Sequence, residues 1–178
     1  LLMILARVLT TEEMGKYSLF LMIVNLALVV GLNWSDSSVV RHGREEHVQS
    51  SKINKSFWAR MYLFIPIIIL ISLIFLIFKN KITEYIGINP NFIFLLIFIF
   101  ILNGLLNFIT YIYQSTDQMK KSAYVLLSQK ALFLISLGII LITSAKSDLT
   151  LILILINLSF LLALIINLFF FNYEKIKP

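Results

Sequence analysis

The chain has 178 residues, of which 60% are hydrophobic and only 13% are charged, and its mean hydropathy is +0.94. Soluble domains are typically about 45–50% apolar, so this composition indicates a membrane protein. The formal net charge is +6, but the basic residues lie beside apolar runs. That placement is typical of membrane topology signals and contacts with lipid headgroups, not of nucleic-acid binding. With no cysteine, the sequence excludes disulfides.

Long uncharged runs dominate the chain. A run of about 18 or more apolar residues is long enough to cross the hydrocarbon as a helix. A spanning segment must be helical because lipid offers no partner for backbone hydrogen bonds. A β-barrel would instead show short alternating segments. The runs are residues 17–35, 61–78, 85–116, 122–145 and 149–173, and only the fourth contains a charge, Lys130.

These runs predict an all-α, polytopic transmembrane helix bundle over residues 1–178, with six helices of which the first is truncated. The apolar residues before Arg7 predict the end of a first helix whose start is missing. Thr11 is expected to cap a short turn, Asn89 and Pro90 to start the fourth helix, and Asp148 to cap the sixth. We predict helices over about residues 1–9, 17–34, 58–78, 91–113, 121–144 and 149–172. The segment 35–60 is expected to be a solvated loop.

The distribution of lysine and arginine predicts the orientation. The connections 35–60, 114–121 and 173–178 hold nine of these residues, the opposite connections hold five, and Lys130 is inside a helix. Cytoplasmic connections carry the excess of positive charge. The N-terminus and the 35–60 loop are therefore expected in the cytoplasm. The low glycine and proline counts, with heavy use of Ile, Asn, Lys and Phe, are typical of an AT-rich bacterial genome, so the chain is expected to be a multi-pass protein of a bacterial inner membrane.

Lys130 is the most informative single residue. It lies about nine residues into its predicted helix, or about 13 Å at 1.5 Å per residue. An intramembrane charge is costly and usually faces a cavity or a partner. All nine carboxylates lie outside the predicted spans. An anionic ligand in a wet cavity would suit this lysine, and a side chain that snorkels to the surface is the alternative.

Polar residues recur along two predicted helices. Seven-residue spacing nearly returns to the same helix face, so each set predicts one polar stripe. The stripes could line a hydrophilic path, or they could form helix–helix hydrogen bonds. Asn25 and Asn157 are expected to serve packing. The stripes comprise Ser122, Gln129, Ser136 and Thr143 in one helix, and Asn103, Asn107, Thr110 and Gln114 in another.

The sequence shows no constellation typical of catalysis. It has no Ser-His-Asp pattern, no glycine-rich phosphate loop and no inward-facing carboxylate pair, so we expect a non-enzyme without a cofactor. His42 and His47 are five residues apart, which matches no strong zinc motif, and no metal site is predicted.

One stretch carries a more specific pattern than hydropathy, LARVLTTEEMGKYSLFLMIVNLALVVGLNWSDSSVVRHG. It resembles the N-terminal region of bacterial polysaccharide flippases, the lipid-linked oligosaccharide branch of the multidrug/oligosaccharidyl-lipid/polysaccharide exporter superfamily. The segment YIYQSTDQMKKSAYVLLSQKALFLI is similar to the family's connection between helices four and five. Thr11 stands where the family commonly has proline. The matching residues are Ala6, Arg7, Leu9, Glu12, Glu13, Gly15, Tyr17, Gly31, Leu32 and Arg41.

The resemblance implies an N-terminal lobe that works with a second, C-terminal lobe. It implies that the protein moves a polyprenyl-pyrophosphate-linked oligosaccharide across the membrane for polysaccharide biosynthesis, along a basic path between the lobes. Its partners would be that lipid-linked oligosaccharide and membrane lipids. The candidate substrate-binding residues are Lys130, Gln129, Asn103, Asn107 and Arg41.

Two alternatives stay open. A multidrug or cation exporter of the same superfamily would share the fold, but we would expect acidic residues in its lobe. A polytopic polysaccharide polymerase or glycosyltransferase would need catalytic groups on a long extracytoplasmic loop, and the corresponding connections here are short.

Overall fold

The computed structural model describes residues 2–143 and 148–170. These residues form helices joined by short connections, with no strand among them. Five helices are long and apolar enough to cross a membrane, namely α2, α4, α6 together with the preceding η2, α7 and α8. The predicted all-α polytopic bundle is therefore confirmed. The elements are α1 (Leu2–Val8), α2 (Thr11–Gly31), η1 (Asn33–Ser35), α3 (Asp36–Ser50), α4 (Asn54–Ile77), α5 (Lys79–Ile86), η2 (Pro90–Phe92), α6 (Ile93–Ser115), α7 (Met119–Thr143) and α8 (Leu149–Phe169).

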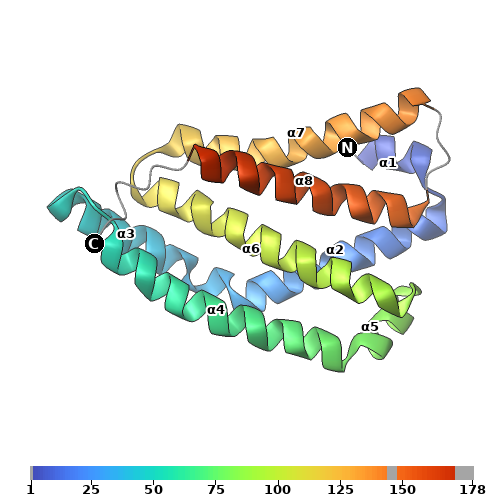
Figure 1. Ribbon diagram of the computed structural model, residues 1–178, viewed down its shortest axis with the longest axis horizontal. Coiled ribbons are helices and arrows are strands. Elements are labelled where there is room, and N and C mark those ends of the chain that lie inside the picture. Colours follow the sequence, from blue (N-terminus) through green and yellow to red (C-terminus); the bar gives the residue numbers. More distant parts are fainter. Residues whose placement is uncertain (1, 144–147, 171–178) are drawn as a thin grey trace.

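Helix α6 lies near the middle of the bundle, with α7 and α8 on one side and α2 and α4 on the other (Figure 1). It packs against each of these helices and against α3. Helix α3, the start of α4 and the α6–α7 connection lie together at one end, which we name the α3 end. The α1–α2 connection, α5 and η2 lie at the opposite end, the α5 end. The described connections that the charge count assigned to opposite sides of the membrane thus lie at opposite ends of the bundle.

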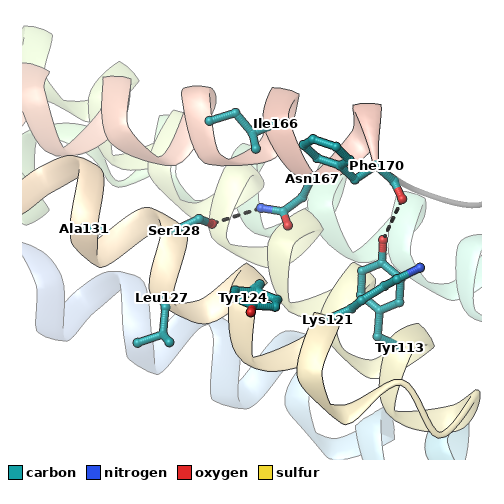
Figure 2. Close-up of a pocket in the computed structure, with 9 residues that line it drawn as sticks. All are labelled: Tyr113, Lys121, Tyr124, Leu127, Ser128, Ala131, Ile166, Asn167 and Phe170. Atoms are coloured by element: carbon teal, nitrogen blue, oxygen red, sulfur yellow. Dashed lines mark hydrogen bonds between the residues drawn. The ribbon is translucent and has the colours of Figure 1, made fainter.

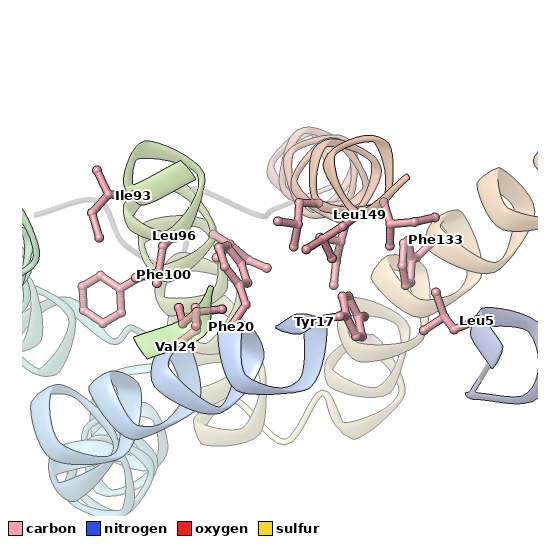
Figure 3. Close-up of a cluster of buried hydrophobic side chains, with 14 of the residues drawn as sticks. Leu5, Tyr17, Phe20, Val24, Ile93, Leu96, Phe100, Phe133 and Leu149 are labelled. Atoms are coloured by element: carbon pink, nitrogen blue, oxygen red, sulfur yellow. The ribbon is translucent and has the colours of Figure 1, made fainter. Parts of the chain in front are cut away.

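The core joins helices that are distant in sequence. Figure 3 shows buried apolar side chains from α1, α2, α6, α7 and α8 gathered between the helices. Leu5 of α1, Phe20 of α2 and Phe100 of α6 are completely buried. Burying aromatic and aliphatic side chains of this size stabilises the packed helices by dispersion contacts, which matter most where lipid surrounds the outside.

Helix α4 contributes least to the core. Only 17% of its most apolar window is buried, less than in any of the other four candidate spans. The run 61–78 is apolar on every face, which suits a helix that faces lipid. Helix α4 therefore turns most of its surface toward the surroundings of the bundle.

Helix α2 begins earlier than predicted, at Thr11 and not near residue 17. The N-cap is Thr10, so the expected cap at Thr11 was wrong. Thr10 Oγ1 accepts a hydrogen bond from the Glu13 amide (3.3 Å), and Glu13 Oε2 accepts one from the Thr10 amide (2.9 Å). This reciprocal capping box satisfies two backbone donors that would otherwise lack partners.

The prediction that residues 35–60 form a solvated loop was wrong. They fold as η1, α3 and the start of α4. Helix α3 packs closely on α6 because Gly43 has no side chain: a Cβ there would lie 2.8 Å from Ser115 Cβ. The turn after α3 buries Ile53. Glu46 then caps α4, accepting hydrogen bonds from the Lys55 amide (2.7 Å) and the Ser56 amide (2.9 Å).

The connection after α4 also forms a short helix, α5, which the sequence analysis did not predict. It ends at Gly87, whose φ of +74° lies in the left-handed region that glycine adopts easily. The chain then enters η2 at Pro90, capped by the Asn89 side chain, as predicted. The Asp148 cap of α8 is likewise confirmed, since its Oδ1 accepts a hydrogen bond from the Leu151 amide (3.2 Å).

Candidate functional site

An open cavity of about 340 Å³ lies between α2 and α7. Helices α6 and α8 pack against both of these helices and contribute the rest of the lining. The cavity is thus assembled from four spanning helices. Its polar lining residues are Tyr17 and Asn25 of α2, Asn103 of α6, and Gln129 and Lys130 of α7.

Lys130 occupies the middle of α7. It follows Met119 by eleven residues, which is roughly 16 Å along the helix at 1.5 Å per residue. Its side chain is exposed on the cavity side of the helix. Among the described residues, no carboxylate lines this cavity and Lys130 forms no ion pair. The cavity therefore presents a single amine at mid-helix depth without a compensating negative charge.

Gln129 is held in position by a neighbouring helix. Its Nε2 donates a hydrogen bond to Ser159 Oγ of α8 at 3.3 Å, and Ser159 itself is buried. This contact ties α7 to α8 directly beside Lys130. Gln129 accordingly serves both as a packing contact and as part of the cavity wall.

The residues of the predicted polar stripe of α6 do not all lie in the cavity, because some of them form hydrogen bonds within the helix bundle instead. Asn103 lines the cavity, whereas Asn107, one turn farther along, is half-buried and does not line it. Thr110 Oγ1 donates to the Leu106 carbonyl of its own helix (2.8 Å). Gln114 Nε2 donates to Ser122 Oγ of α7 (3.2 Å). Only one member of this stripe therefore belongs to the cavity.

The described members of the predicted α7 stripe likewise have different surroundings. Ser122 is buried and accepts the hydrogen bond from Gln114, so it serves helix packing. Ser136 Oγ donates to the Phe133 carbonyl within α7 (2.8 Å). The side chain of Thr143 lies outside the described residues. Of these polar residues, only Gln129 and the flanking Lys130 line the cavity, whereas Ser122 forms a helix–helix hydrogen bond, the other alternative that the sequence left open.

Arg41 lies away from the cavity. It is exposed on α3, and its Nε contacts Glu45 Oε1 at 3.4 Å. The structure therefore brings together three of the five candidate residues, Lys130, Gln129 and Asn103, but neither Asn107 nor Arg41.

Two cavity residues were missed as candidates. Asn25 was expected to serve packing, and Tyr17 was noted only as part of the family pattern. Both line the cavity together with Leu21. The three are spaced four residues apart, which places them along one face of α2. The sequence could have predicted from this spacing that the three residues share a helix face, but not that this face lines a cavity.

A second polar feature lies at the α3 end. Arg60 Nη2 donates to Asp36 Oδ1 (2.5 Å) and to the Leu32 carbonyl (2.9 Å), and both charged side chains are buried. Burial raises the pKa of Asp36 above its usual value of 3.8, although the Arg60 guanidinium and a hydrogen bond from Tyr111 act to lower it. The pair joins the break after α2 to the start of α3 and to α4. Its position indicates a structural role, distinct from the cavity.

Neither a family model, a curated protein nor a solved structure matches this chain.

Proposed function

We propose that this protein is one lobe of a membrane transporter that moves a lipid-linked sugar diphosphate across the bacterial inner membrane. The observation that supports it is the cavity around Lys130. An exposed amine halfway along a candidate spanning helix, without a carboxylate in its described surroundings, suits an anionic ligand.

The polar lining of the cavity suits both parts of such a ligand. The Lys130 ammonium can donate up to three hydrogen bonds to diphosphate oxygens. The amides of Asn25, Asn103 and Gln129 each offer donors and an acceptor, which is the chemistry that recognises sugar hydroxyls. The apolar helix surfaces around the cavity suit the polyprenyl chain.

The cavity is partly open to its surroundings. In the proposed transporter a second lobe supplies the facing wall, and rocking of the two lobes exposes the site alternately to each side of the membrane. The family pattern around Arg7 and the following helix is consistent with this arrangement, and the substrate itself is an expectation from that resemblance.

The proposed orientation places the α3 end in the cytoplasm. Among the described residues, the connections at this end carry seven lysines and arginines, against four at the α5 end. Cytoplasmic connections carry the excess of positive charge. The diphosphate substrate would then reach the cavity from the leaflet at the α3 end and leave toward the α5 end.

The cavity chemistry favours this function over export of cationic drugs. A cationic ligand would meet the Lys130 ammonium, and no carboxylate in the described lining offsets that repulsion. The charge of the cavity therefore favours an anionic diphosphate over a cationic drug. Accumulation of a cationic dye in the same cells provides the comparison, and we expect the protein not to lower it.

Glycan export tests the proposal in cells. The full-length protein is expressed in a strain that lacks its own flippase, and surface glycan is quantified. Lys130→Ala should abolish export while the protein still inserts at normal abundance. Lys130→Arg should retain part of the activity, because the charge remains but the guanidinium geometry differs. Normal export by the alanine variant at normal abundance would overturn the proposal.

A further inference from the structure

A second hollow lies on another face of α7, against α8 (Figure 2). It is a groove of about 650 Å³, and it shares no lining residue with the Lys130 cavity. We name it the α7–α8 groove. It is lined by Tyr113, Lys121, Tyr124, Leu127, Ser128, Ala131, Ile166, Asn167 and Phe170.

The groove changes from polar to apolar along α7. Lys121, Tyr124, Leu127 and Ala131 follow one another at spacings of three or four, so they lie along one helix face. Lys121 is near the α3 end of α7 and Ala131 is ten residues farther on. That separation is roughly 15 Å along the helix. One leaflet of the hydrocarbon core has about the same depth, roughly 15 Å.

The deep polar atoms of the groove already have partners within the protein. Asn167 Nδ2 donates to Ser128 Oγ (3.0 Å) and to the Ala163 carbonyl (2.7 Å). The bond from Asn167 to Ser128, drawn in Figure 2, joins α7 to α8 across the floor, whereas the bond to Ala163 lies within α8. The remaining deep surface is apolar, with Leu127 59% exposed. A hydrocarbon chain suits this surface better than water does.

The mouth of the groove has the opposite character. Lys121 is exposed, and its Nζ lies 5.7 Å from the centre of the Tyr113 ring. No carboxylate lines the groove in the part of the chain that the structure describes. The acidic residue of the adjoining connection, Asp117, contacts Arg44 instead (3.3 Å). Tyr124 is 68% exposed beside the lysine, and tyrosine favours the level of the lipid headgroups.

We propose that the α7–α8 groove binds one anionic phospholipid from the leaflet at the α3 end. Its phosphate contacts the Lys121 ammonium, and one acyl chain lies along Leu127 and Ala131 against Ile166. Positive charge at the mouth and an apolar channel one leaflet deep select this ligand over a protein segment or a soluble anion. The bound lipid contacts both α7 and α8 and so stabilises their packing. This proposal does not depend on the transported substrate.

Lipid retention by the purified full-length protein tests the proposal. Native mass spectrometry and thermal unfolding are recorded with phosphatidylglycerol, with phosphatidylcholine of the same chains, and with glycerol phosphate. Phosphatidylglycerol should be retained and should raise the unfolding temperature more than phosphatidylcholine does. Glycerol phosphate, which lacks chains, should neither shift the unfolding temperature nor compete.

Two matched pairs of variants locate the lipid. Lys121→Gln should weaken phosphatidylglycerol binding about fivefold, the effect expected for one basic residue at an anionic surface. Lys120→Gln makes the same charge change on an exposed neighbour outside the groove and should bind as the wild type does. Ala131→Phe should displace the acyl chain, whereas Ala123→Phe, at an exposed position outside the groove, should not.

Several outcomes would overturn the proposal. Equal retention of the two lipids would remove the role of charge, and equal effects of the two lysine variants would remove Lys121 from the site. Competition by glycerol phosphate would indicate a site for soluble phosphates. Dissociation of an oligomer by Ala131→Phe, without loss of lipid, would show that a second copy of the chain occupies the groove. None of these measurements uses transport, so their failure leaves the proposed function untouched.

Discussion

Arg60 of α4 and Asp36 of α3 form a buried ion pair, with Nη2 2.5 Å from Oδ1. The same guanidinium donates to the Leu32 carbonyl at the end of α2 (2.9 Å). One side chain therefore connects the break between α2 and α3 with the first turns of α4. Since both charged side chains are removed from solvent, the pair is more consequential for stability than the exposed ion pairs of α3.

The first prediction concerns this pair. Asp36→Ala should lower the free energy of unfolding by about 3 kcal/mol, because it leaves a buried guanidinium without its counter-charge. The double change Asp36→Ala with Arg60→Leu should recover part of the loss. Asp117→Ala breaks the exposed contact with Arg44 and serves as the control, with little expected effect. Unfolding in detergent micelles measures all three, and equal losses for Asp36→Ala and Asp117→Ala would contradict the account.

The second prediction is a pH dependence at Glu46. Burial raises the pKa of Glu46, but hydrogen bonds from Ser56 and Lys55 outweigh it and hold the pKa below its usual 4.5. A carboxylate with a lowered pKa stabilises the fold above its unfolded pKa and loses that contribution as the pH falls through the folded value. The stability difference between wild type and Glu46→Gln should therefore be largest at neutral pH.

That difference should shrink on acidification below 4.5. Glu45→Gln is the control, since Glu45 is exposed and caps no helix. A difference between wild type and Glu46→Gln that stays constant with pH would show that the carboxylate charge is not what caps α4.

The third prediction concerns the contact between α3 and α6. Gly43→Ala should destabilise the protein by about 1–3 kcal/mol, because the added Cβ would lie 2.8 Å from Ser115 Cβ and the helices must shift. Gly138→Ala is the matched control in a helix, where a Cβ meets nothing within 4 Å. It should be neutral or stabilising, since alanine has the higher helix propensity. Thermal unfolding that ranks the two variants in the reverse order would rule out close packing at Gly43.

The fourth prediction concerns the orientation in the membrane. The 178-residue sequence contains no cysteine, so each introduced cysteine is the only one in this sequence. Ser50→Cys, at the end of α3, should resist an impermeant thiol reagent in intact cells and react after the cells are opened. Asn80→Cys, exposed on α5, should react from outside. Ready labelling of Ser50→Cys from outside would reverse the proposed topology.

The sequence predicted the spanning helices because each is a long apolar run, and only the run of α7 contains a charge, Lys130. It did not predict α3 or α5, whose polar residues give no hydropathy signal. Helix α3 packs on α6 at Gly43. This contact joins residues far apart in the sequence, so the local pattern around Gly43 does not indicate it. Asp36 and Arg60 were counted as loop charges because their pairing joins residues 24 positions apart.

The same limit applies to the candidate site. The seven-residue spacing predicted that Ser122 and Gln129 share one side of α7, but it could not tell which neighbouring helix each would meet. Ser122 meets Gln114 of α6, whereas Gln129 meets Ser159 and the cavity. Lys130 was identified because a charged side chain within an apolar run has a high free-energy cost in the membrane, whichever helix face it lies on. Asn25 was assigned to packing because burying one uncharged amide in a membrane helix costs much less free energy than burying a charge, so its presence does not point to a cavity.

Translocation by the reconstituted protein tests the central claim most directly. The full-length protein is placed in proteoliposomes, and the rate of flipping of a fluorescent polyprenyl-diphosphate sugar is measured. We expect Lys130→Ala to slow flipping about tenfold or more, the cost of losing one charge-assisted contact. Lys120→Ala, the same change outside the cavity, should flip at the wild-type rate. Wild-type flipping by Lys130→Ala at equal protein content would contradict the claim that this amine binds the diphosphate.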